Sequence, residues 1–113
     1  MTKDVSDNAV LVYTTFPDIT SAKRIGGELV DRGLVACVNI IPAMVSIYRW
    51  EGKLEQSDEV VAIFKTREAR TEDVVREIEQ FHPYDVPAVL TFKADGGSAG
   101  YLSWIREMTK GAS

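Results

Sequence analysis

Apolar and β-branched residues dominate one long stretch, residues 35–50, which is followed by a short polar turn at Glu51 and Gly52. A second apolar run at residues 58–66 returns along it, so the pattern predicts a long antiparallel hairpin. The 16 residues of the first run would span roughly 50 Å as a strand, whereas a domain of this size has a radius of gyration of about 13 Å. We therefore expect the hairpin to extend beyond its own domain. Pro42 cannot donate a ladder hydrogen bond and predicts a bulge or bend in the first strand.

The rest of the chain alternates further strands with amphipathic helices. Two β-prone runs predict strands at residues 9–15 and 87–94. Three stretches with apolar residues at helical spacing predict helices at residues 19–32, 71–82 and 99–108. Asp18 and Ser98 are the expected N-caps of the first and last helix. Gly26 and Gly27 lie inside the first helix, where we expect them to allow close packing on the sheet.

The resulting order, β-α-β-β-α-β with a further C-terminal helix, predicts an α+β fold of the ferredoxin-like, split βαβ type. Two helices would cover one face of the antiparallel sheet and leave the other face uncovered. Its apolar residues and the overhanging hairpin favour a partner subunit, because exposed apolar strands aggregate unless another chain covers them. We expect one domain at residues 8–110, with flexible tails at residues 1–7 and 111–113.

Composition narrows the classes of partner. The 13 basic and 17 acidic residues give a net charge of −4, so we expect no nucleic-acid partner. The apolar runs are far shorter than the roughly 20 residues that cross a bilayer, and no signal peptide is evident, so we expect no membrane association and a cytoplasmic location. The single cysteine, Cys37, cannot form an internal disulfide, and we expect it to be a small core side chain.

His82 is the only histidine and, with Asp85 nearby, the leading candidate for a metal ligand. The alternative is that its ring packs or hydrogen-bonds beside Pro83. We expect no enzyme activity, because the sequence offers no set of nucleophile, base and orienting group.

A second group of residues could bind a small anion in clefts between subunits. Lys65 at the end of an apolar strand, with Arg49 and Glu59, suggests a charged pocket. Large amphipathic side chains could line it or pack in an interface. The residues expected at such a cleft are Arg49, Trp50, Glu59, Lys65, Tyr84 and Trp104.

Four segments carry a family resemblance: CVNI at residues 37–40, SIYRWEGKL at 46–54, HPYDVP at 82–87 and YLSW at 101–104. Together they resemble the CutA divalent-cation-tolerance family, over roughly residues 10–108. The resemblance implies a ferredoxin-like domain, a tight homotrimer with inward-facing sheets similar to PII signalling proteins, and a role in tolerance of copper and other divalent metals. The side chains expected at the trimer interface are Val45, Ile47, Tyr48 and Trp50.

The resemblance also bears on metal ligands. Bacterial members proposed to bind copper carry a cysteine near the end of the first strand and two histidines before the Pro-Tyr pair; the matching positions here are Thr14, Phe81 and His82. Only His82 can act as an imidazole ligand, so we expect copper or zinc to be held weakly and not to be required for folding. The predicted function is a trimeric, cytoplasmic, non-enzymatic protein of divalent-metal tolerance. The alternative is a PII-like small-anion sensor or adaptor for an unidentified protein partner.

Overall fold

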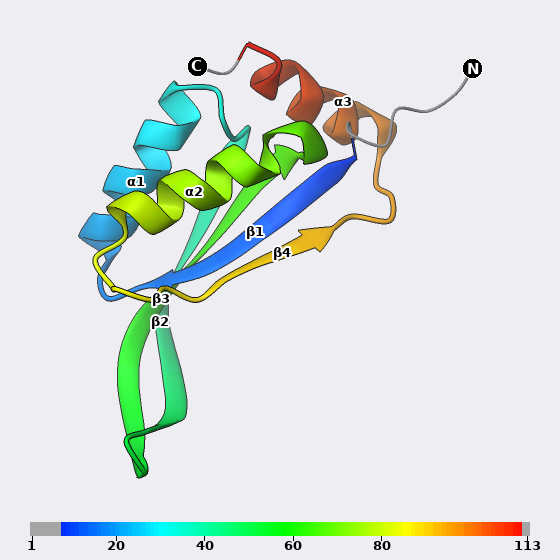
Figure 1. Cartoon of the computed structure of the whole chain (residues 1–113). Helices are drawn as coiled ribbons and strands as arrows, with labels where there is room; N and C mark the ends of the chain where they lie inside the picture. Colours follow the sequence, from blue (N-terminus) through cyan, green and yellow to red (C-terminus); the bar gives the residue numbers. More distant parts are fainter. Residues whose placement is uncertain (1–7, 112–113) are drawn as a thin grey trace.

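The computed structural model describes residues 8–111 as a four-stranded antiparallel sheet with order β2-β3-β1-β4 (Figure 1). The elements are β1 (Ala9–Phe16), α1 (Ile19–Asp31), β2 (Cys37–Trp50), β3 (Lys53–Arg67), the short 3-10 helix η2 (Glu68–Arg70), α2 (Thr71–Phe81), β4 (Val89–Lys93) and α3 (Ala99–Thr109). This order confirms the predicted ferredoxin-like arrangement. The predicted tails at residues 1–7 and 112–113 lie outside the described residues, and Gly111 lies in a turn.

The main core lies between one face of the sheet and the helices α1 and α2. Phe16 and Phe64 from the strands are fully buried there, with Leu29 of α1 and Ile78 of α2. Gly26 lies against β2, since a Cβ atom on it would come within 2.8 Å of Val38 Cγ1. The predicted close packing is therefore confirmed at this glycine and was wrong for Gly27, where an added Cβ would meet nothing within 4 Å.

The ends of the elements follow from local hydrogen bonds. Asp18 caps α1 by accepting a bond of 2.7 Å from the Ser21 N–H. The strand β2 begins at Cys37 and not at Val35, because the Val35 N–H bonds to the Leu29 carbonyl oxygen at the end of α1. Ser98 occupies the N-cap position of α3, but its side chain makes no capping hydrogen bond, so that part of the prediction was wrong.

The β4 strand is also shorter than its apolar run. It spans residues 89–93 instead of 87–94, and its first expected residue, Pro87, has no N–H to donate to a ladder. Ala94 still donates a 2.9 Å bond to the Ala9 carbonyl oxygen, just beyond the last strand residue.

The hairpin of β2 and β3 projects beyond the helical layer, as predicted (Figure 1). The molecule measures 54 × 26 × 22 Å and its radius of gyration is 15.1 Å, above the roughly 13 Å of a compact domain. A bulge interrupts the pairing between Ile41 and Met44, beside Pro42, and Ala43 adopts a φ of +65° there. One extra residue on β2 therefore changes which side chains face each side of the hairpin arm.

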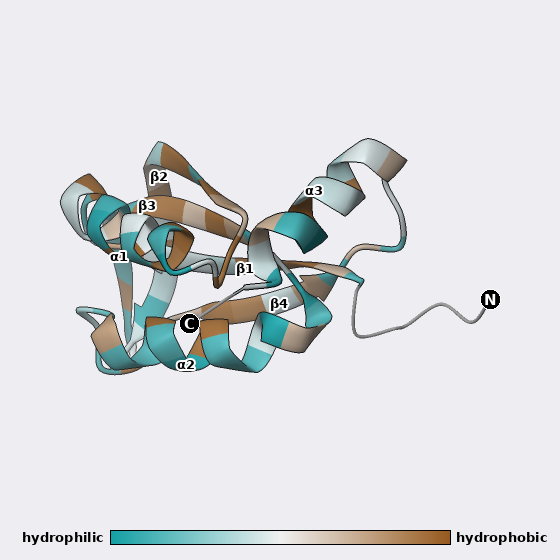
Figure 2. Cartoon of the chain, turned by 90° about the horizontal axis from the view of Figure 1, so that it is seen from above, coloured by the Kyte–Doolittle hydropathy of each residue, from teal (hydrophilic) through white to brown (hydrophobic). Residues whose placement is uncertain are grey.

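The second face of the sheet is partly covered, contrary to the sequence-based expectation. The helix α3 packs on its end through Ile105, against Ala9 and Ala36. Beyond α3 this face exposes apolar side chains, including Leu90 at 57% and Phe92 at 53%. Figure 2 shows hydrophobic segments along β3 and β4 and many hydrophilic residues on α2. No helix within residues 8–111 is long and apolar enough to cross a membrane.

Candidate functional site

Five residues meet where the hairpin leaves the body of the domain: Thr15, Phe16, Glu59, His82 and Tyr84, here called the His82 cluster. The helix α2 ends at Phe81, and His82 takes an extended backbone (φ −69°, ψ 141°), as expected for a residue that precedes a proline. Its ring then lies on Phe16 of β1, with ring centroids 4.5 Å apart and planes at 11°. The turn after α2 is thereby joined to the end of a central strand.

Both ring nitrogens of His82 are engaged. Nε2 lies 2.7 Å from the Thr15 carbonyl oxygen, and Nδ1 accepts a 3.0 Å bond from the Tyr84 N–H. Because a carbonyl oxygen only accepts and an amide N–H only donates, these contacts fix the neutral tautomer with its proton on Nε2. Burial lowers the pKa of His82 from its usual value of 6.5, against the opposing effects of the Thr15 bond and the Glu59 charge. The only lone pair that a metal could use is therefore already bound to Tyr84.

Glu59 forms the other half of the cluster. Its Oε2 atom accepts hydrogen bonds from the Tyr84 hydroxyl at 2.9 Å and the Thr15 hydroxyl at 3.2 Å. Burial, with the Glu59 hydrogen bond and charge, raises the pKa of Tyr84 to about 12. The carboxylate links β3, β1 and the loop after α2, so this arrangement stabilises the base of the hairpin.

The residues at the expected copper-ligand positions do not converge as ligands. Thr14 is fully buried, and its hydroxyl has no hydrogen-bond partner among residues 8–111. Phe81 is 54% exposed and lines a cavity of ≈ 250 Å³ between α1 and α2. Asp85 is exposed, and within the described range no three His, Cys, Asp or Glu residues lie close enough to hold a metal. These side chains do not fit a preformed copper site, and ligation by His82 would require release of its bond to Tyr84.

Lys65 lies in a different group, at the end of the sheet that α3 covers. Its Nζ atom donates a 3.0 Å bond to the Tyr101 hydroxyl and lies 5.3 Å from the centroid of that ring. Cys37 Sγ is 3.7 Å from the same hydroxyl, and the Tyr101 and Trp104 rings stack at 5.6 Å. Cys37 is therefore only half-buried and faces α3, so its expected place in the core was wrong.

The remaining cleft candidates lie at the tip of the hairpin. Arg49 donates a 3.2 Å bond to the Gly52 carbonyl oxygen, and Trp50 is exposed. Arg49 pairs with Leu54, eleven residues before Lys65 on β3, a separation of roughly 36 Å along a strand. Within the single chain the six candidates thus form three separate groups, and only Glu59 and Tyr84 belong to the His82 cluster.

The side chains expected at a trimer interface lie on the same arm. Val45, Ile47 and Trp50 are exposed, and Tyr48 bonds through its hydroxyl to Ser57 at 2.7 Å. Sequence reasoning missed the contact of Tyr101 with Lys65 and noted this tyrosine only as part of the YLSW segment at residues 101–104. Its hydroxyl was the available signal, because a tyrosine at an element end usually finds a polar partner when it is covered.

Comparison with known proteins agrees with this fold. A family model described as CutA1 divalent ion tolerance protein matches residues 10–108. The divalent-cation tolerance protein CutA of Pyrococcus horikoshii is 44% identical over 101 residues, which are 89% of this chain and 98% of that protein. The chloroplastic protein CutA 1 of Oryza sativa is 37% identical over 102 residues; the match takes in 90% of this chain but spans only 58% of the rice protein's length.

A solved structure shows the same similarity in three dimensions. The crystal structure of CutA1 from Oryza sativa superposes with a TM-score of 0.89 at 36% identity, covering 94% of this chain and 97% of that one. The family match and the fold agree over nearly the whole described range. The chain therefore belongs to the CutA1 divalent ion tolerance family.

Proposed function

We propose that this protein acts in the tolerance of divalent cations, copper foremost, as a cytoplasmic, non-enzymatic homotrimer. The observation that carries the proposal is the family match over residues 10–108, which takes in both the hairpin arm and the His82 cluster. Tolerance is a property of the cell, so the proposal does not require a tight metal site in the protein.

The trimeric state is supported by what a single chain leaves exposed. The arm presents Ile47 and Trp50 to solvent, and the sheet face beyond α3 presents Leu90 and Phe92. Isolated soluble domains rarely expose so much apolar surface on strands, because it drives association. Packing of three copies with their sheets inward would bury this face and support each arm on a neighbour.

Direct metal binding by His82 and Asp85 stays a prediction. Weak binding is consistent with the geometry at His82, since a metal must displace the Tyr84 N–H from Nδ1. Asp85, three residues later in the sequence, offers an exposed carboxylate. The alternative function, a small-anion sensor at the predicted cleft, gains no support from the separation of its residues in the protomer. It would need neighbouring subunits to bring Arg49, Lys65 and Tyr84 together.

Three measurements test the proposal. The first is growth of cells that lack the gene, at rising copper concentration, with and without a plasmid copy of this chain; equal sensitivity would overturn the role in tolerance. The second is isothermal titration of copper and zinc into the purified protein and into His82→Ala. Loss of binding in the variant would assign the metal to His82, whereas identical binding by both would remove it as a ligand. Cell fractionation checks the cytoplasmic location.

A further inference from the structure

The cavity of ≈ 250 Å³ between the helices α1 and α2, here called the α1–α2 cavity, is a second candidate site. Both helices cover the same face of the sheet (Figure 1), whereas the proposed trimer would bury the opposite face. The residues of the His82 cluster do not line this cavity. It is therefore separate both from the candidate site described above and from the expected interface.

The floor of the cavity is apolar and preformed. Ile25 and Leu29 of α1 line it, and both side chains are buried in the main core, where close packing holds them in place. Phe81, at the end of α2, lines the same cavity with more than half of its surface exposed. An exposed ring beside a fixed apolar floor offers a surface on which a second ring or a branched side chain can pack.

An ion pair closes the cavity at one end. Arg32, the C-cap residue of α1, bonds to Glu77 of α2. Their side chains are only 31% and 16% exposed, so these two charges are engaged and largely covered. The polar partners of a ligand must therefore lie at the other end of the cavity. Arg24 lies there, eight residues before Arg32 and roughly 12 Å away along the helix.

Two charges of opposite sign remain at this other end. Arg24 and Glu28 are exposed, and neither side chain makes a hydrogen bond or ion pair with another of residues 8–111. The pKa of Asp18 is lowered first by its bond from the Ser21 N–H and then by the charge of Arg24. Arg24 and Glu28 are four residues apart, but a base that precedes its acid along a helix is the less favourable order for pairing. Both groups are thus available to a ligand.

We propose that the α1–α2 cavity binds a free amino acid with an aromatic or large aliphatic side chain. The ligand carboxylate bonds to the Arg24 guanidinium, its ammonium bonds to the Glu28 carboxylate, and its side chain packs on Phe81. A zwitterion matches this end of the cavity because Arg24 and Glu28 occupy neighbouring turns, with about 5–6 Å between such Cβ atoms. The volume, ≈ 250 Å³, lies just below the range of drug-sized ligands, about 300–1,000 Å³, and suits a smaller molecule. This binding is additional to the proposed role in metal tolerance.

Titration of L-phenylalanine into the isotope-labelled full-length protein, followed by backbone amide NMR shifts, tests the proposal. We expect the amides of Arg24, Glu28 and Phe81 to shift with a Kd of about millimolar, which is typical of a ligand with about a dozen non-hydrogen atoms. L-alanine carries both charges but no large side chain, so it should bind about tenfold more weakly or worse.

Two variants identify the polar partners. Arg24→Gln should weaken binding of L-phenylalanine about tenfold, because a charge-assisted hydrogen bond is lost. It should leave binding of phenethylamine, which has no carboxylate, within about twofold of the wild type. Glu28→Gln should cause the same loss for L-phenylalanine and leave phenylpropionate, which has no ammonium, unaffected. Both side chains are exposed, and thermal unfolding without ligand checks that each variant folds.

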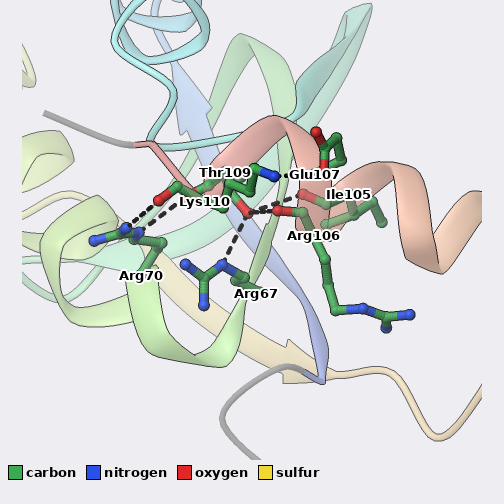
Figure 3. Close-up of polar contacts among 7 residues, drawn as sticks. All are labelled: Arg67, Arg70, Ile105, Arg106, Glu107, Thr109 and Lys110. Carbon is green, nitrogen blue, oxygen red and sulfur yellow. Dashed lines mark hydrogen bonds and ion pairs between the residues drawn. The ribbon is translucent and has the colours of Figure 1, made fainter.

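The matched control is Arg106→Gln, which removes the same charge from α3, on the other face of the sheet. Arg70 anchors the end of this helix by donating 3.0 Å bonds to the carbonyl oxygens of Thr109 and Lys110. Figure 3 shows the Arg106 side chain extending away from Arg70, so the variant keeps this anchor. It should bind L-phenylalanine within about twofold of the wild type.

Three results would overturn the proposal. One is the absence of shifts in the wild type on addition of L-phenylalanine, and another is an equal loss of affinity in Arg24→Gln and Arg106→Gln. The third is binding of N-acetylphenylalanine amide as tight as that of L-phenylalanine, because this compound lacks both charges and represents an apolar segment of another protein. The copper sensitivity of cells is measured separately, so the role in metal tolerance and this proposal can fail independently.

Discussion

The imidazole of His82 donates a hydrogen bond of 2.7 Å to the carbonyl oxygen of Thr15, 67 residues earlier in the chain. Thr15 lies at the end of a central strand, and His82 follows the last turn of α2. The bond fixes the helix end on the sheet and buries the ring against Phe16. The protonation state of one side chain is thus coupled to the folded structure.

The protein should become less stable as the pH falls through the range set by the pKa of His82. Burial lowers its folded-state pKa below the usual 6.5, so the unfolded chain binds more protons in this range. The stabilisation is fully present above pH 6.5 and is lost as pH falls from there through the lower folded-state pKa. Protonation of Nδ1 also removes the acceptor for the Tyr84 N–H. Chemical denaturation at fixed protein concentration, from about pH 8 to about pH 5, measures this change in the free energy of unfolding.

The control for this pH dependence is His82→Gln. The chain has 1 histidine, so the variant should lose the part of the pH dependence near neutrality while the acidic part, due to carboxylates, remains. Parallel curves for wild type and variant across this range would contradict the assignment.

Glu59 should control the ionisation of Tyr84. The Tyr84 pKa of about 12 comes first from burial and then from Glu59, so Glu59→Gln should lower it while leaving it above the usual 10.0. Because the folded state favours the neutral phenol, its stabilisation is present below the usual value and is lost as pH rises through about 12. Alkaline difference absorbance follows the tyrosines, and Tyr84→Phe identifies the last step. An unchanged last step in Glu59→Gln would refute the coupling.

The two adjacent glycines of α1 should respond differently to alanine. In Gly27→Ala the new Cβ meets nothing within 4 Å, so the variant should gain about 1 kcal/mol from helix propensity. In Gly26→Ala the Cβ would lie 2.8 Å from a methyl of Val38, a β-branched side chain with few rotamers. Overpacking of this kind costs about 1–3 kcal/mol. Gly26→Ala should therefore be the less stable by about that amount in urea denaturation, and equal stabilities would contradict the close contact.

The sequence predicted the features that depend on neighbours along the chain. Helical periodicity indicated α1 and α2, Pro42 indicated the bulge, and the length of the apolar run indicated the overhanging arm. The start of β2 was missed because the Val35 N–H bonds back to the Leu29 carbonyl oxygen. Hydrophobic periodicity does not indicate which carbonyl oxygen a backbone N–H binds.

The contacts within the candidate site could not be predicted in the same way. Glu59 and Tyr84 are 25 residues apart, and Lys65 and Tyr101 are 36 apart. Such pairs depend on how helices are placed on the sheet and on rotamers, which hydrophobic periodicity does not determine. For the same reason, the sequence indicated the apolar side of α3 but not the face of the sheet on which this helix packs.

A charge on the hairpin arm should block assembly before it unfolds the protomer. Ile47 is 64% exposed in the single chain, so Ile47→Asp should lower the stability of that chain only slightly. Burial of the unpaired carboxylate in an interface would instead destabilise the assembly by several kcal/mol. We expect light scattering at about micromolar concentration to give three times 12.5 kDa for the wild type and a smaller mass for the variant, with the circular dichroism of both alike. Val30→Asp makes the same change on α1, at a side chain 40% exposed, and should remain trimeric. A monomeric wild type would overturn the argument from the arm, and a trimeric Ile47→Asp would place the interface elsewhere.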